Sequence, residues 1–337
     1  MDTLINKKAI IPSLIIFIVI TLLSGCQKTE DEGIYISFTR TSKALETTIF
    51  EFNLSDEEVN AVGFFTYNAQ YPLGVYSREN NKMYYSAKAE DGHGDQLWEY
   101  DIETEERTQL TDGIYGMNFI VPVDDSIYLV AWCFDNDYNA LNLYCYDIES
   151  RSLELLQDDP AFNIGVLSYS PENKEFMFAG EDAVEMWHRF DIQCNEYPFY
   201  PPTNNVYSMK DNVIKLVFST EDNEDIVALA MNDQYILYRT ISESWTLHED
   251  GSFTGDTKEH VYLMNRETND KTEITDEVFS HVGKFIYLAN SGDFYCLYYG
   301  DGYNQIVTIN LDDLSYVHKI HLAPSNAFAI NNGIALN

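Results

Sequence analysis

The chain has 337 residues, of which 45% are hydrophobic and 14% aromatic, so it can build a packed core and is not a disordered acidic tail. Its formal net charge of −35 excludes nucleic acid as a partner and disfavours anionic lipid surfaces, because both would repel it. Length alone leaves the number of domains open.

The first predicted element is an N-terminal targeting segment. Lys7 and Lys8 precede an apolar run, Ile10–Leu23, which is followed by Ser24-Gly25-Cys26. A signal peptidase cleaves after a short apolar run that ends in small residues, and a cysteine at that point resembles the lipobox of bacterial lipoproteins. The resemblance implies cleavage before Cys26 and acylation of its thiol and new amino group by palmitate-type chains. The alternative, a spanning anchor, needs about 20 apolar residues, and this run is shorter.

The predicted organisation is a signal peptide at residues 1–25, a lipidated tether at 26–33 and a folded body at 34–337. The lipid holds the body on the extracytoplasmic side of the bacterial cell membrane, where we expect a monomer. Of the other four cysteines, Cys133 and Cys145 lie symmetrically about Asn139 in a predicted hairpin. A disulfide between them and two buried free thiols both stay open. The chain has no C-x-x-C pair, so a zinc or thioredoxin-type site has no support.

A repeated segment indicates the architecture. Nearly every copy has large apolar residues one and three positions before a terminal Asp or Asn, which is typical of a strand with one buried face. An apolar residue on the opposite face indicates that sheets stack against sheets, and the Asp or Asn can start a turn. The six copies are Ile49–Asn53, Leu97–Asp101, Leu143–Asp147, Trp187–Asp191, Val261–Asn265 and Ile306–Asn310.

The spacing of these repeats predicts an all-β fold, a single β-propeller of four-stranded blades. The terminal Asx residues stand at 53, 101, 147, 191, 265 and 310, and a four-stranded blade takes about 40–50 residues. Six blades are favoured. The long interval from 191 to 265 leaves open an insertion between Gln193 and Asp225 or a seventh, reduced blade. The four strands of one blade are expected at Leu73–Ser77, Met83–Lys88, Gln96–Ile102 and Arg107–Thr111.

Both ends of the chain are expected in one blade, which removes open sheet edges. The segments Ile34–Thr39, Thr47–Leu54 and Glu57–Ala61 match the second, third and fourth strands of a blade. The missing first strand is expected from Asn326–Ile330 at the other end of the chain.

Two segments resemble the TolB-like propellers, a family related to the WD40 type. Ser168–Phe178 is similar to their S-P-D-G-K-x-I-x-F repeat, with Glu172-Asn173 in place of Asp-Gly. Trp98–Thr111 is similar to the ending I-Y-x-x-D-x-x-T-G-x-x-x-x-L-T. The resemblance implies the fold over 34–337. Many members of that family bind other proteins, while others carry a separate hydrolase domain, for which this chain has no room.

Loops between second and third strands should emerge on one face of the propeller and give it a ring of carboxylates. The candidate partner-binding residues are Asp91, Asp95, Asp135, Asp137, Asp182, Asp301, Tyr197 and Tyr200. The two tyrosines belong to a proline-rich segment that either docks a partner or packs over a blade edge. Calcium takes 6–8 oxygen ligands, and Asp135, Asp137 and Asn139 are the nearest approach to a calcium loop, although Asp, Asn and Gly are also ordinary turn residues. His188 occupies a core slot of the repeat and would need a hydrogen-bond partner.

No signature of a nucleophile, sialidase or phosphate-binding loop is present, so no catalytic residue, metal or other cofactor is assigned. The preferred interpretation is a non-catalytic binding or scaffold propeller that recognises a protein, peptide or glycan. The alternative is an enzyme acting on extracellular glycans with carboxylates in the central funnel, and a third is a structural spacer. An enzyme should bring together two or three carboxylates with raised pKa values.

Overall fold

The structure is a computed structural model that describes residues 35–53, 57–193, 201–221, 223–248, 250–274, 282–287, 294–300 and 303–324. All of them belong to one compact unit, residues 34–337. Cys26, Tyr197, Tyr200 and Asp301 lie outside the described residues. No helix in the described part of the chain is long and apolar enough to cross a membrane.

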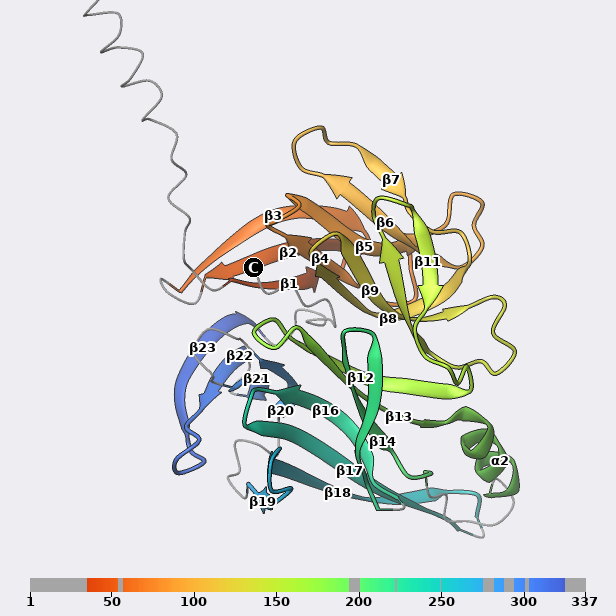
Figure 1. Cartoon of the computed structure of the whole chain (residues 1–337), viewed down its shortest axis with the longest axis vertical. Helices are drawn as coiled ribbons and strands as arrows, with labels where there is room; N and C mark the ends of the chain where they lie inside the picture. The colour runs from red at the N-terminus through yellow and green to blue at the C-terminus, as the bar shows by residue number, and fades with distance from the viewer. Residues whose placement is uncertain are drawn as a thin grey trace, which may run out of the picture. The chain divides into compact units, whose positions relative to one another are not determined.

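Antiparallel sheets follow one another along the chain (Figure 1). The N-terminal sheet has three strands, β1 (Tyr35–Thr41), β2 (Glu46–Asn53) and β3 (Glu58–Thr66). Five four-stranded blades come next. Blade 1 is β4 (Gly74–Ser77), β5 (Lys82–Lys88), β6 (Asp95–Asp101) and β7 (Arg107–Gln109). Blade 2 is β8 (Ile114–Val123), β9 (Ser126–Cys133), β10 (Asn142–Asp147) and β11 (Ser152–Leu155). Blade 3 is β12 (Phe162–Ser170), β13 (Glu175–Asp182), β14 (Asn205–Lys210) and β15 (Val213–Ser219). Blade 4 is β16 (Asp225–Met231), β17 (Tyr235–Leu247), β18 (Phe253–Asn265) and β19 (Lys271–Glu273). Blade 5 is β20 (Val282–Tyr287), β21 (Phe294–Gly300), β22 (Tyr303–Ile309) and β23 (Tyr316–Pro324).

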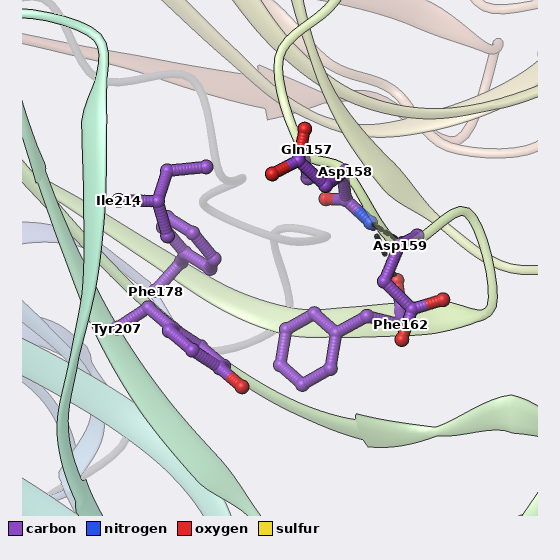
Figure 2. Close-up of a pocket in the computed structure, with 7 residues that line it drawn as sticks. All are labelled: Gln157, Asp158, Asp159, Phe162, Phe178, Tyr207 and Ile214. Atoms are coloured by element: carbon purple, nitrogen blue, oxygen red, sulfur yellow. Dashed lines mark hydrogen bonds between the residues drawn. The ribbon is translucent and has the colours of Figure 1, made fainter.

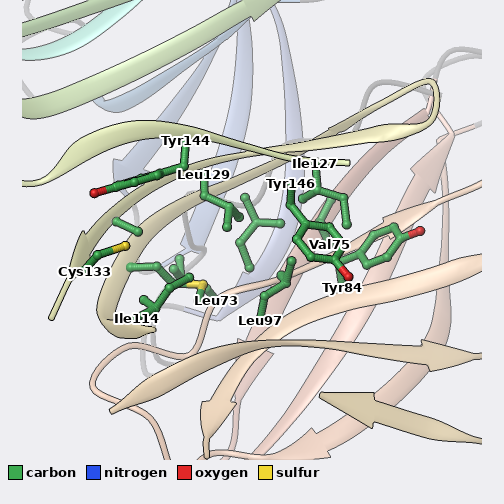
Figure 3. Close-up of a cluster of buried hydrophobic side chains, with 13 residues drawn as sticks. Leu73, Val75, Tyr84, Leu97, Ile114, Ile127, Leu129, Cys133, Tyr144 and Tyr146 are labelled. Carbon is green, nitrogen blue, oxygen red and sulfur yellow. The ribbon is translucent and has the colours of Figure 1, made fainter. Parts of the chain in front are cut away.

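The core lies between consecutive blades, as strands buried on both faces predict. Along β9, Ile127 and Leu129 pack into the cluster shared with blade 1, which Figure 3 shows, while Val130 packs into the cluster shared with blade 3. Because side chains alternate between the two faces of a strand, one strand serves two interfaces. Further clusters join blades 3 and 4, blades 4 and 5, and blade 1 with the N-terminal sheet. The predicted all-β propeller with four-stranded antiparallel blades is confirmed.

The repeated Asp or Asn starts the turn between third and fourth strands, as predicted. Asp101 Oδ1 accepts hydrogen bonds from the Glu103 and Thr104 amides, both at 2.9 Å. The residue four positions after each Asx has a positive φ in four blades, at Glu105, Arg151, Asn269 and Leu314. The turn is therefore one conformation used four times. Blade 3 differs, because Asp211 and Asn212 both have positive φ and form a tighter two-residue hairpin turn.

A buried amide side chain joins neighbouring blades in three places. Each stands at or just before the start of a third strand, and it hydrogen bonds to the backbone where the next blade begins. Gln96 binds both polar groups of Ile114 (Nε2 to O, 2.6 Å; N to Oε1, 3.2 Å), Asn142 Nδ2 donates to Phe162 O (2.8 Å), and the Ile226 amide donates to Asn204 Oδ1 (3.0 Å). Strand pairing does not link these blades, because each sheet ends at its fourth strand. The amide side chains supply hydrogen bonds between one blade and the next.

The described residues form five four-stranded blades rather than the six predicted. The N-terminal strands occur where expected, but with β3 extended to Thr66 they make a three-stranded sheet. The segment 326–330, expected to add its missing strand, lies outside the described residues. The inserted element is helix α2 (Ala183–Gln193), between β13 and β14. The stretch Gln193–Asp225, where an insertion or a reduced blade was expected, holds β14 and β15 of blade 3 and no further sheet among the described residues.

The prediction of a third strand at Trp187–Asp191 is wrong. These residues lie in helix α2 (Ala183–Gln193), and the true third strand of blade 3 is β14. Asp182 Oδ1 accepts from the Glu185 amide (2.9 Å), and Glu185 pairs with Arg189 one turn later. An Asp followed by Glu three residues later is a helix-start signal, and here it prevails over the strand-like pattern. His188 is consequently exposed on the helix and not in a core slot.

Candidate functional site

One end of the blades carries the loops that the sequence singles out. Because neighbouring strands are antiparallel, the connections between second and third strands leave a blade at the same end as the connections between blades. We call this end the loop face. Asp91, Asp135, Asp137 and Asp182 are exposed on it. The blade-to-blade connections add three exposed carboxylates that the sequence analysis missed, Asp112, Asp158 and Asp159.

Several of the predicted acidic residues also shape their own loops. Asp91 Oδ1 accepts from the His93 amide (2.9 Å), and Asp182 caps helix α2. Asp95 is buried at the start of β6, where its carboxylate accepts from the Gln70 amide (2.6 Å). Burial raises the pKa of Asp95, and this hydrogen bond and nearby Lys88 partly oppose the increase. Asp95 is thus a loop anchor and not an exposed contact.

The calcium candidates lie in a loop that is organised by another residue. Asn136 Nδ2 donates to Ala140 O (3.2 Å), and its Oδ1 accepts from the Tyr138 amide (2.8 Å). Asn139 has φ 53°, as a turn residue would. Among the residues that the structure describes, no group of three or more His, Cys, Asp or Glu could hold a metal ion. The arrangement gives calcium no support.

Three aromatic side chains form a partly exposed cluster on the loop face, which we call the aromatic patch. Tyr115 is near the start of β8, Trp132 near the end of β9, and Phe134 follows β9. The Tyr115 ring centroid is 4.4 Å from that of Trp132 and 5.8 Å from that of Phe134. Tyr115 is 39% and Phe134 53% exposed. Asp112 lies three residues before Tyr115 and Asp135 directly after Phe134, so carboxylates adjoin the patch in sequence.

A pocket of about 260 Å³ lies between blades 2 and 3 (Figure 2). The connection from β11 to β12 contributes Gln157, Asp158 and Asp159 on one side. Blade 3 contributes Phe162, Phe178, Tyr207 and Ile214 from four successive strands, on the side that packs against blade 2. Tyr207 is 5.1 Å from Phe162, edge to face, and 5.7 Å from Phe178, stacked, between ring centroids. The pocket therefore combines an aromatic wall with a carboxylate-bearing loop.

Hydrogen bonds hold the acidic loop of this pocket in place. Gln157 Nε2 donates to Asp159 O (2.8 Å) and Phe162 O (3.0 Å), while its Oε1 accepts from the Leu143 amide (3.0 Å). Asp159 Oδ1 accepts from the Ala161 amide (2.9 Å). The loop is thus tied to both β10 and β12, and the Asp159 carboxylate is held in place without a ligand.

Raised carboxyl pKa values occur at two separate places among the described residues. Burial raises the pKa of Glu181, and hydrogen bonds from Asn163 Nδ2 (2.8 Å) and Asn204 Nδ2 (3.4 Å) oppose the increase. The other is Asp95, on blade 1, whereas Glu181 is on blade 3. Each is held by structural hydrogen bonds, and Asn204 Nδ2 also donates to Asp225 Oδ1 (3.1 Å), so Glu181 and Asp225 share one amide donor.

Two other predictions concern side chains near this face. Cys133 and Cys145 are free thiols, because the strand register places Cys145 opposite Tyr128 and Cys133 opposite Ile114. Pro201, at the described end of the proline-rich segment, is buried, and its carbonyl accepts from Arg189 Nη1 (3.2 Å).

Sequence reasoning missed the aromatic patch and the pocket for the same reason. Their residues come from several strands and connections, within 115–134 for the patch and 157–214 for the pocket, and each aromatic fits the ordinary pattern of a strand. The one available signal was Tyr115 next to Gly116 and Phe134 next to Asp135 at strand ends, a pattern that also describes common turns.

No protein-family model matches the sequence, and no curated protein matches it either. Among solved structures, the chain is similar to TolB from Acinetobacter baumannii, with a TM-score of 0.54 and 13% identity over 89% of this chain and 66% of that one. A chain of a nidogen/laminin complex has a TM-score of 0.54 and 9% identity, over 90% of this chain and 98% of that one. A prolyl endopeptidase has a TM-score of 0.51 and 10% identity, over 86% and 41%. The chain thus spans just under two thirds of the TolB chain and less than half of the endopeptidase. These likenesses show the fold, and the predicted TolB-like propeller is confirmed as a fold.

Proposed function

We propose that this chain is a lipid-anchored extracytoplasmic propeller that binds a basic protein or peptide on its loop face, without catalysing a reaction. The observation that carries the proposal is the aromatic patch of Tyr115, Trp132 and Phe134, with exposed carboxylates next to it. Exposed clusters of large aromatic side chains mark interaction sites more often than isolated ones do. Aromatic residues also supply much of the binding energy at protein interfaces.

Charge selects the partner's chemistry. The exposed carboxylates of the loop face belong to a chain with 55 acidic and 20 basic residues, so the field at this face attracts cations. Lys88 is a basic residue near the face, and Arg189 is already paired with Glu185. A basic partner therefore gains both electrostatic steering and charged contacts, whereas a neutral glycan would stack on the rings and hydrogen bond to the carboxylates without electrostatic attraction.

We propose further that residues 326–330 add a strand to the N-terminal sheet and complete a sixth blade. The lipid on Cys26 would hold the body at the membrane, where its negative charge keeps it off the anionic surface.

Binding is tested with the full-length chain, purified in detergent, against an array of peptides that vary in charge and an array of neutral glycans. We expect binding to basic peptides, weakened by salt and reduced at least fivefold by Phe134→Ser. The matched control is Val213→Ser, because Val213 is 54% exposed at the start of β15, beside the turn between third and fourth strands at the opposite end of its blade. Selective binding of neutral glycans, or equal effects of the two variants, would contradict the proposal.

Anchoring is tested separately by growing cells with a clickable palmitate analogue. The chain should be labelled, and Cys26→Ala should abolish the label, while Cys145→Ala should leave it unchanged. Full labelling of Cys26→Ala would rule out the predicted acylation site.

A further inference from the structure

We infer that the pocket between blades 2 and 3 is a subsite for a single arginine side chain of the bound partner. The inference rests on the proposed function, and it names the chemical group that the loop face selects. With a volume of about 260 Å³, the pocket falls just below the range of about 300–1,000 Å³ typical of small-molecule sites. It suits one long side chain better than a whole ligand.

The aromatic wall fits a flat cation. Phe162 and Phe178 are 7% and 1% exposed and pack against Tyr207, at 84° and 23° between ring planes, so the partly exposed Tyr207 presents the accessible ring. A planar guanidinium stacks on such ring faces and is attracted by their negative quadrupole. Ile214 adds an apolar surface for the methylene stem. An ammonium group is more strongly hydrated and has no flat face to stack, so lysine would lose more on entry.

The polar side of the pocket fits the same group. Asp158 is exposed and lines the pocket, and Asp159 is held beside it by the Ala161 amide. Guanidinium donors form paired hydrogen bonds with carboxylates, and such charge-assisted bonds are stronger than neutral ones. Because Gln157 already fixes this loop by three hydrogen bonds, binding does not have to order it.

The acidic loop of the pocket lies on the loop face, where the aromatic patch also lies, and it leaves the blade that carries the patch. The acidic loop follows β11, two strands from β9 in the sheet, but Asn136, two residues after Phe134, donates from Nδ2 to Pro160 O in the acidic loop (3.2 Å). A peptide that contacts the patch can therefore reach the pocket with one side chain. We therefore expect the aromatic patch to supply most of the contact with the peptide and the pocket to select a peptide that carries an arginine.

The test uses three blocked amino acids as probes: N-acetyl-arginine, N-acetyl-citrulline and N-acetyl-lysine, each as the methylamide. Saturation-transfer NMR on the full-length chain in detergent measures their affinities. We expect arginine to bind at least fivefold more tightly than citrulline, its neutral counterpart, and more tightly than lysine. Equal affinity for arginine and citrulline, or preference for lysine, would overturn the inference.

Variants locate the binding. Asp158→Asn should weaken arginine binding about fivefold, while Glu149→Gln, an equal charge change in the turn at the opposite end of β10, should not. Tyr207→Phe keeps the ring and should bind as the parent does, whereas Tyr207→Ser should lose binding. If Asp158→Asn and Glu149→Gln behave alike, or if Tyr207→Ser still binds while remaining folded by circular dichroism, the pocket is not the site.

The two proposals fail differently. If basic peptides bind through Phe134 but blocked arginine ignores the pocket variants, the arginine subsite is wrong and the proposed function stands. If no basic peptide binds although blocked arginine enters the pocket, the proposed function is wrong.

Discussion

The buried Gln96 amide offers the sharpest test of how the blades are joined. Its side chain is 0% exposed, and it binds the backbone O and N of Ile114 at the start of blade 2. The Thr111 hydroxyl also donates to Gln96 Oε1 (2.9 Å). Replacing Gln96 with Met keeps the length and apolar volume of the side chain but removes these hydrogen bonds.

The expected cost follows from the groups left without partners. An unsatisfied buried polar group costs about 1–3 kcal/mol, and relaxation recovers part of that cost, so Gln96→Met should lower the free energy of unfolding by about 2–4 kcal/mol. This is a large share of the roughly 5–15 kcal/mol that stabilises an ordinary domain.

Urea unfolding of the full-length chain, followed by tryptophan fluorescence, measures the change. With a slope m of about 3 kcal/mol/M, the midpoint should fall by about 1 M. Gln234→Met is the matched control, because Gln234 is exposed in the β16–β17 turn, and it should change the free energy by less than about 0.5 kcal/mol. A change at Gln96 no larger than at Gln234 would refute the view that these amides join the blades.

Three further predictions follow from particular contacts. Gly94→Ala should lower the free energy of unfolding more than Gly92→Ala in the same urea assay. Both glycines have positive φ, but only at Gly94 would the new Cβ meet backbone, 2.2 Å from the carbonyl oxygen of Ile114 in blade 2. Equal losses for the two variants would contradict this prediction. Arg266→Ala should cost about 2–3 kcal/mol, because it leaves Glu175, whose side chain is 9% exposed, without the ion pair that links blades 3 and 4; a loss below 0.5 kcal/mol would show that the pair contributes little. For Glu181, burial raises the pKa of the folded state above the pKa of the unfolded chain. At a pH above both values, folding buries a charged carboxylate and costs free energy, and this cost disappears as the pH falls to the pKa of the unfolded chain. Glu181→Gln should therefore gain stability relative to the parent at pH 7.5, with a smaller gain at pH 5, and a gain independent of pH would contradict the assignment.

Much of the fold could be predicted because its signals are local. The strands of blade 1 were expected within one or two residues of their ends, since alternating burial and Asx turns are written in adjacent residues. The turn at Asp101 needs only its own side chain and the next amides. The helix α2 was missed because Trp187–Asp191 also fits the strand pattern, and the cap at Asp182 decides between the two.

The candidate site was predicted only in part. Placing Asp91, Asp135, Asp137 and Asp182 on one face needed only the order of the strands, and that order is a property of the chain. That Asp95 is buried, by contrast, depends on Gln70, which comes from the connection before β4. Its neighbours in sequence do not reveal this contact.

By itself, then, the amino-acid sequence determined the all-β class, the four-stranded unit, the repeated turn and the strongly negative charge, because each depends on residues a few positions apart or on composition. Only the tertiary structure decided which side chains meet. The ring contacts of Tyr115 with Trp132 and Phe134, and the pocket that places Asp158 across from Tyr207, join residues from separate strands. Their proximity results from how the strands of one blade pair and how neighbouring blades pack, and no local pattern encodes that distance.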